Sequence, residues 1–205
     1  MTLKTTLIYP GIAGQGFNSL KRGMEAGWIS HGLAHLSSAA KAAGLDVSLI
    51  DLRALSSWDH FRDVLVERDP DVVAVTLMSV DYNPARKAVG IAKNVKPDLT
   101  TVIGGPHVTI ALEDALQIPH VDYLVTREGE VTFPRLLRLI EAGDPPADRV
   151  LRGEPPDLDG IPFADRELFL EEWRKWGYDL ESPDVLFVAE LQAPFVTIIP
   201  RRGCL

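Results

Sequence analysis

The 205-residue chain is acidic, with 21 Lys and Arg against 29 Asp and Glu and a formal net charge of −8. This balance argues against nucleic-acid and anionic-membrane partners, which require clustered Lys and Arg side chains. The single cysteine, Cys204, excludes an internal disulfide framework and a zinc site built from several cysteines. The first residues lack the apolar core of a signal peptide, and no apolar run approaches the roughly 18 residues of a membrane span, so we expect a cytoplasmic protein.

Five short apolar runs, rich in β-branched residues, alternate with helical patterns up to about Glu141. Apolar residues at consecutive positions are typical of parallel strands that are covered on both faces. Five such units with short loops predict an α/β fold with a doubly wound parallel sheet in the flavodoxin-like order 2-1-3-4-5. Ligands bind such sheets outside the carboxyl ends of the strands. The predicted strands are 5–10, 46–52, 71–77, 100–105 and 121–126.

Helices with recognisable start and stop signals separate these strands. Ser, Thr and Asn side chains can cap a helix start, proline is favoured at the first helical position, and glycine is favoured just past the end. On this basis we predict helix ends before Gly44 and Gly143, and helix starts at Ser56 or Ser57, at Asn83–Pro84 and at Thr109.

The sequence changes character after residue 142. The segment 143–166 is rich in proline and is typical of an extended linker strap. A helix is predicted from Glu167 to Trp176, and "DVLFVAELQAPFVTIIP" favours two strands around Ala193 and Pro194. We therefore predict an α/β domain over 1–142, a proline-rich linker strap over 143–166, and a helix with two strands over 167–205.

The loops that follow the strands hold the candidate ligand-binding residues. Gly104 and Gly105 let a flat ligand approach the main chain closely, and Pro106 fixes the turn before His107. A tight strand-to-helix turn with a solvated histidine explains the same residues without a ligand. The long glycine-rich loop after the first strand holds neither a dinucleotide fingerprint nor a phosphate loop, which argues against a nucleotide ligand.

Six segments, in this order, resemble the cobalamin-binding domain of the radical S-adenosylmethionine enzymes that carry cobalamin in front of their barrel. The resemblance covers nearly the whole chain, including the linker strap and a first barrel strand that runs into the first cysteine of a C-x-x-x-C-x-x-C motif. The segments are "GLAHLSSAAKAAGLDVSLIDL" (32–52), "DPDVVAVTLMSVDYNPA" (69–85), "VIGGPHVTI" (102–110), "VDYLVTREGEVTFPRLL" (121–137), "LDGIPFADRELF" (158–169) and "FVTIIPRRGCL" (195–205).

The resemblance implies that cobalamin lies on the strand ends, with its nucleotide tail between the sheet and the helices. Gly104 and Gly105 would make room for this tail, and Glu128 and Gly129 would lie beside it. The expected cofactor-binding residues are Thr76, Met78, Ser79, Val80, Gly104, Gly105, Pro106, His107, Glu128 and Gly129, with Thr126 and Arg127 as further candidates.

The cobalt ligand is where the chain departs from many cobalamin proteins. Those proteins supply a histidine from D-x-H-x-x-G in the first loop, and no D-x-H occurs in this chain. His107 could ligate cobalt through its imidazole, but the family resemblance makes it a neighbour of the corrin ring. His31 and His35 fall in the first helix, where a packing or surface role is expected. We therefore expect base-off cobalamin without a histidine ligand.

The resemblance also implies chemistry that this chain cannot complete. In the family, three cysteines hold a [4Fe–4S] cluster that binds S-adenosylmethionine, and Cys204 corresponds to the first of them. We therefore expect a chain truncated just after that cysteine, with the helix and the start of a radical S-adenosylmethionine barrel in 167–205. The expected parent is a methyltransferase acting on an unactivated carbon or phosphorus, with the barrel as the missing partner. The chain alone is expected to bind cobalamin and to have no radical activity.

Two other classes of function stay open at this point. A non-enzymatic cobalamin sensor would be favoured by a DNA-binding or output domain, and the tail 195–205 argues against it. An α/β domain that binds a flavin or nucleotide would lack affinity for a corrinoid. The visible spectrum of the chain after mixing with hydroxocobalamin and desalting distinguishes the last class from the first two.

Overall fold

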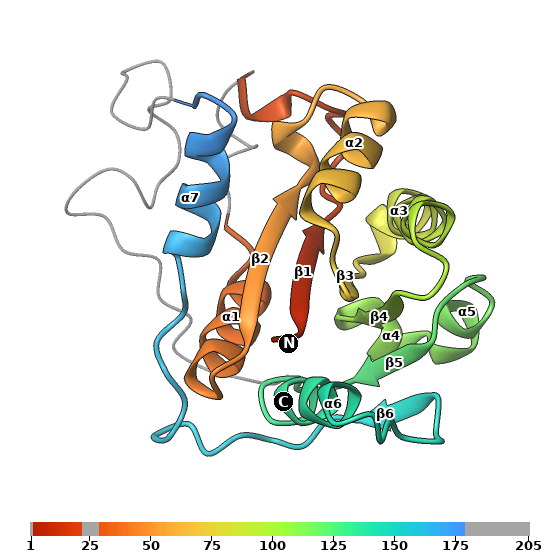
Figure 1. Cartoon of the computed structure of the whole chain (residues 1–205), viewed down its shortest axis with the longest axis vertical. Coiled ribbons are helices and arrows are strands. Elements are labelled where there is room, and N and C mark those ends of the chain that lie inside the picture. The colour runs from red at the N-terminus through yellow and green to blue at the C-terminus, as the bar shows by residue number, and fades with distance from the viewer. Residues whose placement is uncertain (1, 22–28, 179–205) are drawn as a thin grey trace.

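The computed structural model describes residues 2–21 and 29–178, which form one parallel sheet with helices on both faces (Figure 1). The strand order is β2-β1-β3-β4-β5-β6, and every neighbouring pair is parallel. The predicted order 2-1-3-4-5 is therefore confirmed for the first five strands. The strands are β1 (Lys4–Tyr9), β2 (Asp46–Asp51), β3 (Val72–Thr76), β4 (Thr100–Gly104), β5 (Tyr123–Thr126) and β6 (Val150–Arg152).

The sixth strand corrects the prediction of a five-stranded sheet. β6 lies in the segment 143–166, which the sequence analysis treats as an extended strap, and it pairs with β5 from Leu124↔Val150 to Thr126↔Arg152. The strand has only three residues, and Val150 and Leu151 are partly buried while Arg152 is exposed. A strand this short between proline-rich stretches has no apolar periodicity from which it could be recognised.

The helices form two layers, one on each face of the sheet. α1, α6 and α7 pack on one face, while α2, α3, α4 and α5 pack on the other. Three short 3₁₀ helices, at Ser19–Lys21, Leu52–Ala54 and Ser79–Asp81, lie in the loops. The α-helices are α1 (His31–Ala42), α2 (Trp58–Arg68), α3 (Tyr82–Val95), α4 (Pro106–Ile110), α5 (Leu112–Leu116), α6 (Thr132–Glu141) and α7 (Glu167–Lys175).

Alternation along the strands divides the core between these two layers. Leu7 packs with α1 and α6, whereas Ile8 packs with α2 and α3, because successive side chains of a strand point to opposite faces. Both are fully buried, as are Val72 and Val73 in β3. This double burial explains why the strands read as continuous apolar runs.

The predicted helix signals are partly confirmed. Ser57 caps α2, with its hydroxyl accepting a hydrogen bond from the His60 backbone N–H at 3.1 Å. The third helix begins at Tyr82, so Pro84 falls within its first turn rather than at its first position. The prediction that Thr109 caps the fourth helix is wrong, because α4 already begins at Pro106 and Thr109 lies inside it.

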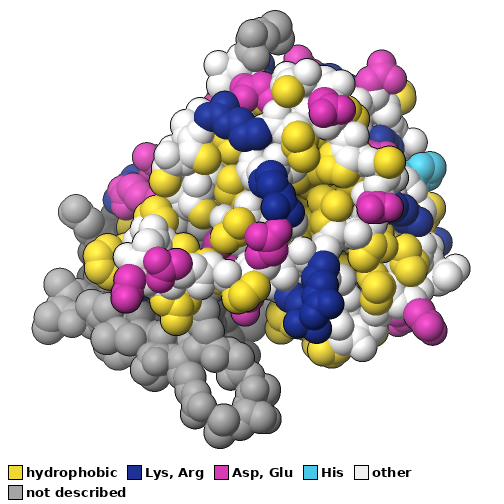
Figure 2. All heavy atoms as spheres, turned by 90° about the horizontal axis from the view of Figure 1, so that it is seen from below, with side chains coloured by type: hydrophobic (Ala, Val, Ile, Leu, Met, Phe, Trp, Pro, Cys, Tyr) yellow, Lys and Arg dark blue, Asp and Glu magenta, His cyan; other side chains and the backbone are white. Residues whose placement is uncertain are grey.

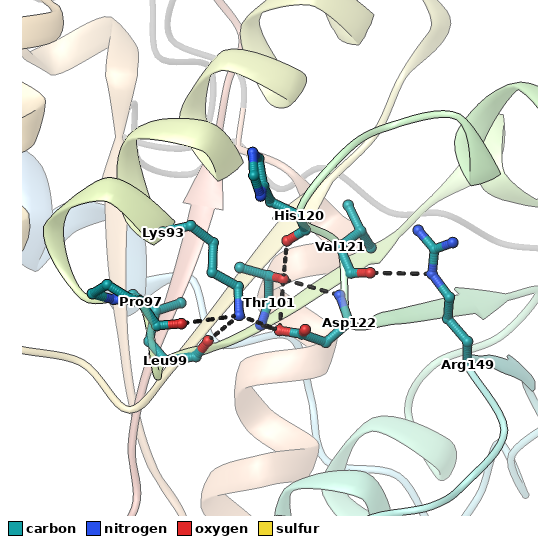
Figure 3. Close-up of polar contacts among 8 residues, drawn as sticks. All are labelled: Lys93, Pro97, Leu99, Thr101, His120, Val121, Asp122 and Arg149. Carbon is teal, nitrogen blue, oxygen red and sulfur yellow. Dashed lines mark hydrogen bonds and ion pairs between the residues drawn. The ribbon is translucent and has the colours of Figure 1, made fainter.

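The amino ends of β4 and β5 are joined by a polar network (Figure 3). The Thr101 hydroxyl donates to the His120 carbonyl at 2.5 Å, and the Asp122 backbone N–H donates to that hydroxyl at 3.0 Å. The Asp122 carboxylate accepts the Thr101 backbone N–H at 2.7 Å and pairs with Lys93 at 2.8 Å. This network fixes the register of the two strands at the end opposite their carboxyl ends.

The face shown in Figure 2 mixes charges of both signs with hydrophobic side chains. Within the described ranges, no helix is both long and apolar enough to cross a membrane. Cys204 and the two predicted strands between 184 and 200 lie outside the described residues.

Candidate functional site

A cavity of about 730 Å³ opens at the carboxyl ends of the central strands. It lies between the strand ends and the helices α1 and α6, on the face of the sheet where Leu7 packs. This is the position in which open α/β sheets bind ligands, and the volume is within the range of organic cofactor sites. The walls are mostly apolar, from Leu7, Leu33, Leu36, Ala74, Val75, Val102, Ile110, Val125 and Phe133, with polar groups contributed by Tyr9, Ser30, Thr76, Thr109, Arg127, Glu128 and Glu130.

Glycines line much of this cavity. A Cβ on Gly129 would lie 2.8 Å from Leu36 Cδ2, and a Cβ on Gly104 would lie 3.4 Å from the Val125 carbonyl oxygen. Both glycines line the cavity, together with Gly32 and Gly105. The absence of side chains at these positions leaves backbone accessible to a ligand.

Gly105 is also required by the backbone. Its φ of +110° with ψ of −178° belongs to a region that essentially only glycine occupies. A Cβ there would lie 3.0 Å from the Leu77 backbone nitrogen and carbonyl oxygen. Leu77 in turn donates to the Gly104 carbonyl at 2.7 Å and accepts from the His107 backbone N–H at 3.0 Å. The loops after β3 and β4 are thereby bonded directly to each other.

The structure brings most of the expected cofactor-binding residues together around this cavity. Three of them come from β4 and the turn that follows it, two from β3 and its loop, and two from the loop after β5. The residues that line the cavity are Thr76, Met78, Gly104, Gly105, Pro106, Glu128 and Gly129, whereas Ser79, Val80 and His107 do not.

His107 lies behind the cavity wall. Its side chain is buried, its Nδ1 is 2.9 Å from the Ser79 hydroxyl, and its Nε2 is 3.7 Å from an Asp114 carboxylate oxygen. The Tyr82 ring packs edge-on against it at 5.6 Å between ring centroids. These contacts tie the 3₁₀ helix at Ser79–Asp81 to α4, so His107 supports the rim of the cavity.

Exposed hydrophobic side chains mark the rim on this side. Val80 is 74% exposed, Ile110 is 77% exposed and Met78 is 43% exposed. Met78 and Ile110 also line the cavity. An apolar rim of this kind suits a large, flat ligand that extends beyond the cavity.

The loop after β5 forms the opposite wall. Arg127 has a left-handed backbone with φ of +61°, and its N–H donates to the Thr109 hydroxyl at 2.7 Å. Behind this loop, the Gly153 N–H donates to the Thr126 carbonyl at 2.8 Å, and a Cβ on Gly153 would overlap the Glu128 carbonyl oxygen. The strand β6 and the residue after it thus support the cavity wall from outside.

The wall residues that come from β1 and from the helices are not among the cofactor-binding residues expected from the sequence. Tyr9 ends β1, Leu36 lies on α1 and Phe133 lies on α6, and all three line the cavity. The helix positions have the apolar spacing of ordinary core residues, which hides their role. Tyr9 could have been found, because it is an aromatic residue at the carboxyl end of a predicted central strand.

Among residues 2–21 and 29–178, no group of three or more His, Cys, Asp or Glu side chains is placed to hold a metal ion. The walls of the cavity carry no histidine. The described lining of the cavity combines glycine backbone, apolar walls and a few polar groups, which is the composition of many organic-ligand sites.

Fold and site together define a ligand-binding domain of the open α/β class. A family model described as "B12 binding domain" matches residues 24–137, more than half of the chain. The chain therefore belongs to the B12-binding domain family. The matched range contains β2 to β5 and α1 to α5, and it ends within α6.

Curated relatives are considerably longer than this chain. It is 27% identical over 190 residues to an uncharacterized methyltransferase of Pyrococcus horikoshii, covering 84% of this chain and 38% of the relative. It is 33% identical over 125 residues to an anaerobic magnesium-protoporphyrin IX monomethyl ester cyclase of Rubrivivax gelatinosus, covering 60% of this chain and 22% of the relative. The chain thus spans between about a fifth and two fifths of these relatives.

A solved structure shares the fold. The cobalamin-dependent S-adenosylmethionine radical enzyme OxsB, with aqua-cobalamin and S-adenosylmethionine bound, superposes with a TM-score of 0.65 at 15% identity. The superposition covers 85% of this chain and 25% of that one. At this identity the likeness supports the fold alone.

Proposed function

We propose that the chain is the cobalamin-binding module of a radical S-adenosylmethionine enzyme, most simply a methyltransferase that acts on an unactivated carbon or phosphorus. The observation that carries the proposal is the cavity at the strand ends, with its glycine cradle, inside a domain of the B12-binding family. The names of the longer relatives, a methyltransferase and a cyclase, support the enzyme class.

The residues of the cavity fit the nucleotide tail of cobalamin. Gly104, Gly105 and Gly129 line the cavity with backbone and no side chain, and the cavity continues between the sheet and α1. The exposed apolar side chains of Met78 and Ile110 at the rim suit contact with the corrin ring. Arg127 at the mouth supplies a positive charge for the phosphate of the tail.

Cobalamin is proposed to bind base-off, without a histidine of this chain on cobalt. Support comes from His107, which faces Ser79 and Asp114 behind the wall, and from His31 and His35, which lie within α1. Cobalamin supplies the capacity to carry a methyl group when it is bound. The chain's own residues enclose the tail, keep water out of the cavity and present one face of the ring.

The cluster and S-adenosylmethionine are assigned to a further domain in the parent protein. The chain holds one cysteine, Cys204, and spans a minor part of its relatives. In this proposal 1–142 form the main part of the cobalamin-binding domain. Residues 143–166 form the linker, whose strand β6 joins the sheet, and 167–205, of which α7 packs on the domain, lead into a barrel. Cys204 is proposed as the first cluster ligand.

Mixing the purified chain with hydroxocobalamin, desalting it and recording its visible spectrum tests the proposal. We expect a coloured protein with about one corrinoid per chain, and a spectrum without the features of a histidine-ligated cobalt. A chain that stays colourless, alone and when extended through the adjoining domain, would contradict cobalamin binding. Flavin mononucleotide is the control ligand, because a chain that retains flavin and no corrinoid would be a flavin-binding α/β domain.

The enzyme class needs a separate test. The chain extended to include the further cysteines, reconstituted with iron and sulfide, is expected to cleave S-adenosylmethionine under reducing conditions. The 205-residue chain with its single cysteine is expected not to do so. Cleavage by the 205-residue chain would contradict the assignment of the cluster and S-adenosylmethionine to a further domain.

A further inference from the structure

Tyr9 occupies an unusual position at the cavity, because one of its ring faces is covered by a buried arginine. The guanidinium carbon of Arg53 lies 4.4 Å from the centroid of the Tyr9 ring, and Arg53 is 3% exposed. The ring also meets Phe169 edge-on at 6.1 Å between centroids. A Cβ on Gly11 would lie 2.6 Å from Tyr9 Cε1, so the chain closes on the ring from a third side.

The arginine is held in turn by a fully buried carboxylate. Asp51 accepts from Arg53 Nε at 2.9 Å and from Arg53 Nη2 at 2.6 Å, which is a bidentate pair. It also accepts the Arg53 backbone N–H at 3.0 Å. A buried pair of this kind needs all its hydrogen bonds satisfied, since each missing partner leaves a desolvated charge.

The fourth hydrogen bond to Asp51 comes from a distant part of the chain. The indole N–H of Trp173, in α7, donates to Asp51 Oδ2 at 2.9 Å. Trp173 is 1% exposed, and its ring lies 5.8 Å from the Arg53 guanidinium carbon. Phe169, which contacts Tyr9 directly, belongs to the same helix. Helix α7 therefore reaches the Tyr9 ring both directly and through Asp51 and Arg53.

Two independent anchors fix α7 against the domain. Glu172, which is 1% exposed, pairs with Arg68 at 2.6 Å and accepts the Trp176 indole N–H at 3.0 Å. Before the helix, Asp165 accepts from the Ser37 hydroxyl and from Lys41, both at 2.6 Å. α7 lies beside α1 and β2, as Figure 1 shows.

From this arrangement, and resting on the proposed function, we infer that Tyr9 is a cofactor-contacting residue and that α7 positions it through Trp173, Asp51 and Arg53. Tyr9 and residues 167–175 both lie outside the range 24–137 that the family model matches. Burial raises the pKa of Tyr9, so its phenol stays neutral at the wall of the cavity.

A matched pair of variants in α7 tests the positioning role. Trp173→Phe removes the indole N–H that donates to Asp51, whereas Trp176→Phe removes the one that donates to Glu172, away from the cavity. We expect Trp173→Phe to weaken hydroxocobalamin binding about fivefold or more, because Asp51 and Arg53 no longer hold the Tyr9 ring in place, and Trp176→Phe to change it less than about twofold. Thermal unfolding of both variants reports their loss of stability separately.

The contact role is tested at Tyr9 itself. Tyr9→Leu is expected to weaken binding about tenfold, and Tyr9→Phe, which keeps the ring, is expected to weaken it less. Equal losses in the two variants would overturn the role of the ring. Equal affinities of Trp173→Phe and Trp176→Phe would overturn the role of α7.

A readout without cofactor separates this inference from the proposed function. In the chain labelled with 3-fluorotyrosine, the ¹⁹F signal of Tyr9 is assigned by its loss in Tyr9→Phe. We expect Trp173→Phe to shift this signal and Trp176→Phe to leave it in place, whether or not cobalamin binds. An unshifted signal in Trp173→Phe would overturn the positioning role, and a chain that binds no corrinoid would overturn the contact role together with the proposed function.

Discussion

At the scale of single residues, Gly105 is needed for the backbone conformation of the turn after β4 and also lines the cavity. Its φ of +110° and the 3.0 Å approach of Leu77 leave no room for a side chain. We expect Gly105→Ala to lower the free energy of unfolding by about 2–3 kcal/mol, since a non-glycine residue in this region is strained. Chemical denaturation monitored by circular dichroism measures this loss.

Gly90 provides the matched control for this substitution. It lies inside α3, and a Cβ there would meet no atom within 4 Å. Gly90→Ala is expected to stabilise the chain by about 0.5–1 kcal/mol, because alanine is the better helix former. Similar effects of the two substitutions would show that the turn at Gly105 tolerates a side chain.

Two threonines at opposite ends of the sheet separate stability from binding. Thr101→Val removes the hydroxyl that bonds to the His120 carbonyl and the Asp122 N–H (Figure 3), so we expect a loss of about 1–3 kcal/mol in unfolding free energy. Thr109→Val removes the acceptor of the Arg127 N–H at the cavity. We expect it to weaken hydroxocobalamin binding with a smaller loss of stability. The reverse pattern would contradict the placement of the site at the carboxyl end.

Sequence reasoning at this scale succeeded where one residue type carries a local requirement. The cap of α2 was predicted at Ser56 or Ser57, and Ser57 is the residue that caps it. It failed at Thr109, because a proline already starts the helix three residues earlier. The burial of His107 behind the wall depends on Ser79 and Asp114 from other segments, which no local pattern reveals.

At the scale of elements, the strap that precedes α7 is attached to α1 by a charged anchor, Asp165, whose contribution depends on pH. Burial alone would raise the pKa of Asp165, but hydrogen bonds from Lys41 and Ser37 and the charge of Lys41 outweigh it and hold the pKa below its ordinary value of 3.8. Because the folded-state pKa is lowered, the stabilisation is present above the ordinary pKa and is lost as pH falls through the folded-state value.

We therefore expect the free energy of unfolding to decrease when the pH is lowered under about 4, and part of this decrease to come from Asp165. In Asp165→Asn, stability at pH 7 should be lower and its decrease on acidification shallower. Urea denaturation at several pH values measures both slopes. Ser37→Ala is the control, because it removes one hydrogen bond while the carboxylate and Lys41 remain. A pH profile of Asp165→Asn parallel to that of the unmodified chain would contradict this anchor.

The elements also show why the sequence could not reveal the whole sheet. The first five strands are apolar enough to be recognised, because each is covered on both faces. β6 is positioned from outside its own sequence, by pairing with β5 and by Gly153 against the loop at Glu128. Such a strand forms because β5 offers an unpaired edge. Its three residues are too few to show a strand pattern in the sequence.

At the scale of the whole molecule, the order of the first five strands and the end of the sheet at which the cavity opens could both be predicted, since topology rules leave few alternatives. The depth of the cavity could not be predicted, because it depends on how closely α1 and α6 pack against the sheet near Gly129. There a Cβ would lie 2.8 Å from Leu36, and both residues line the cavity. In Gly129→Val, either the new side chain or a displaced Leu36 would occupy part of that volume.

The effect of a ligand on thermal stability tests whether it binds in this cavity. A ligand that binds only the folded chain stabilises it by about 2.7 kcal/mol at a concentration 100 times its Kd. We expect hydroxocobalamin to raise the melting temperature of the unmodified chain and of Thr101→Val by similar amounts, because Thr101 lies at the far end of the strands. Gly129→Val should lose most of this rise while keeping its fold without ligand. A full ligand-induced rise in Gly129→Val would mean that the corrinoid binds outside the cavity between the sheet and α1.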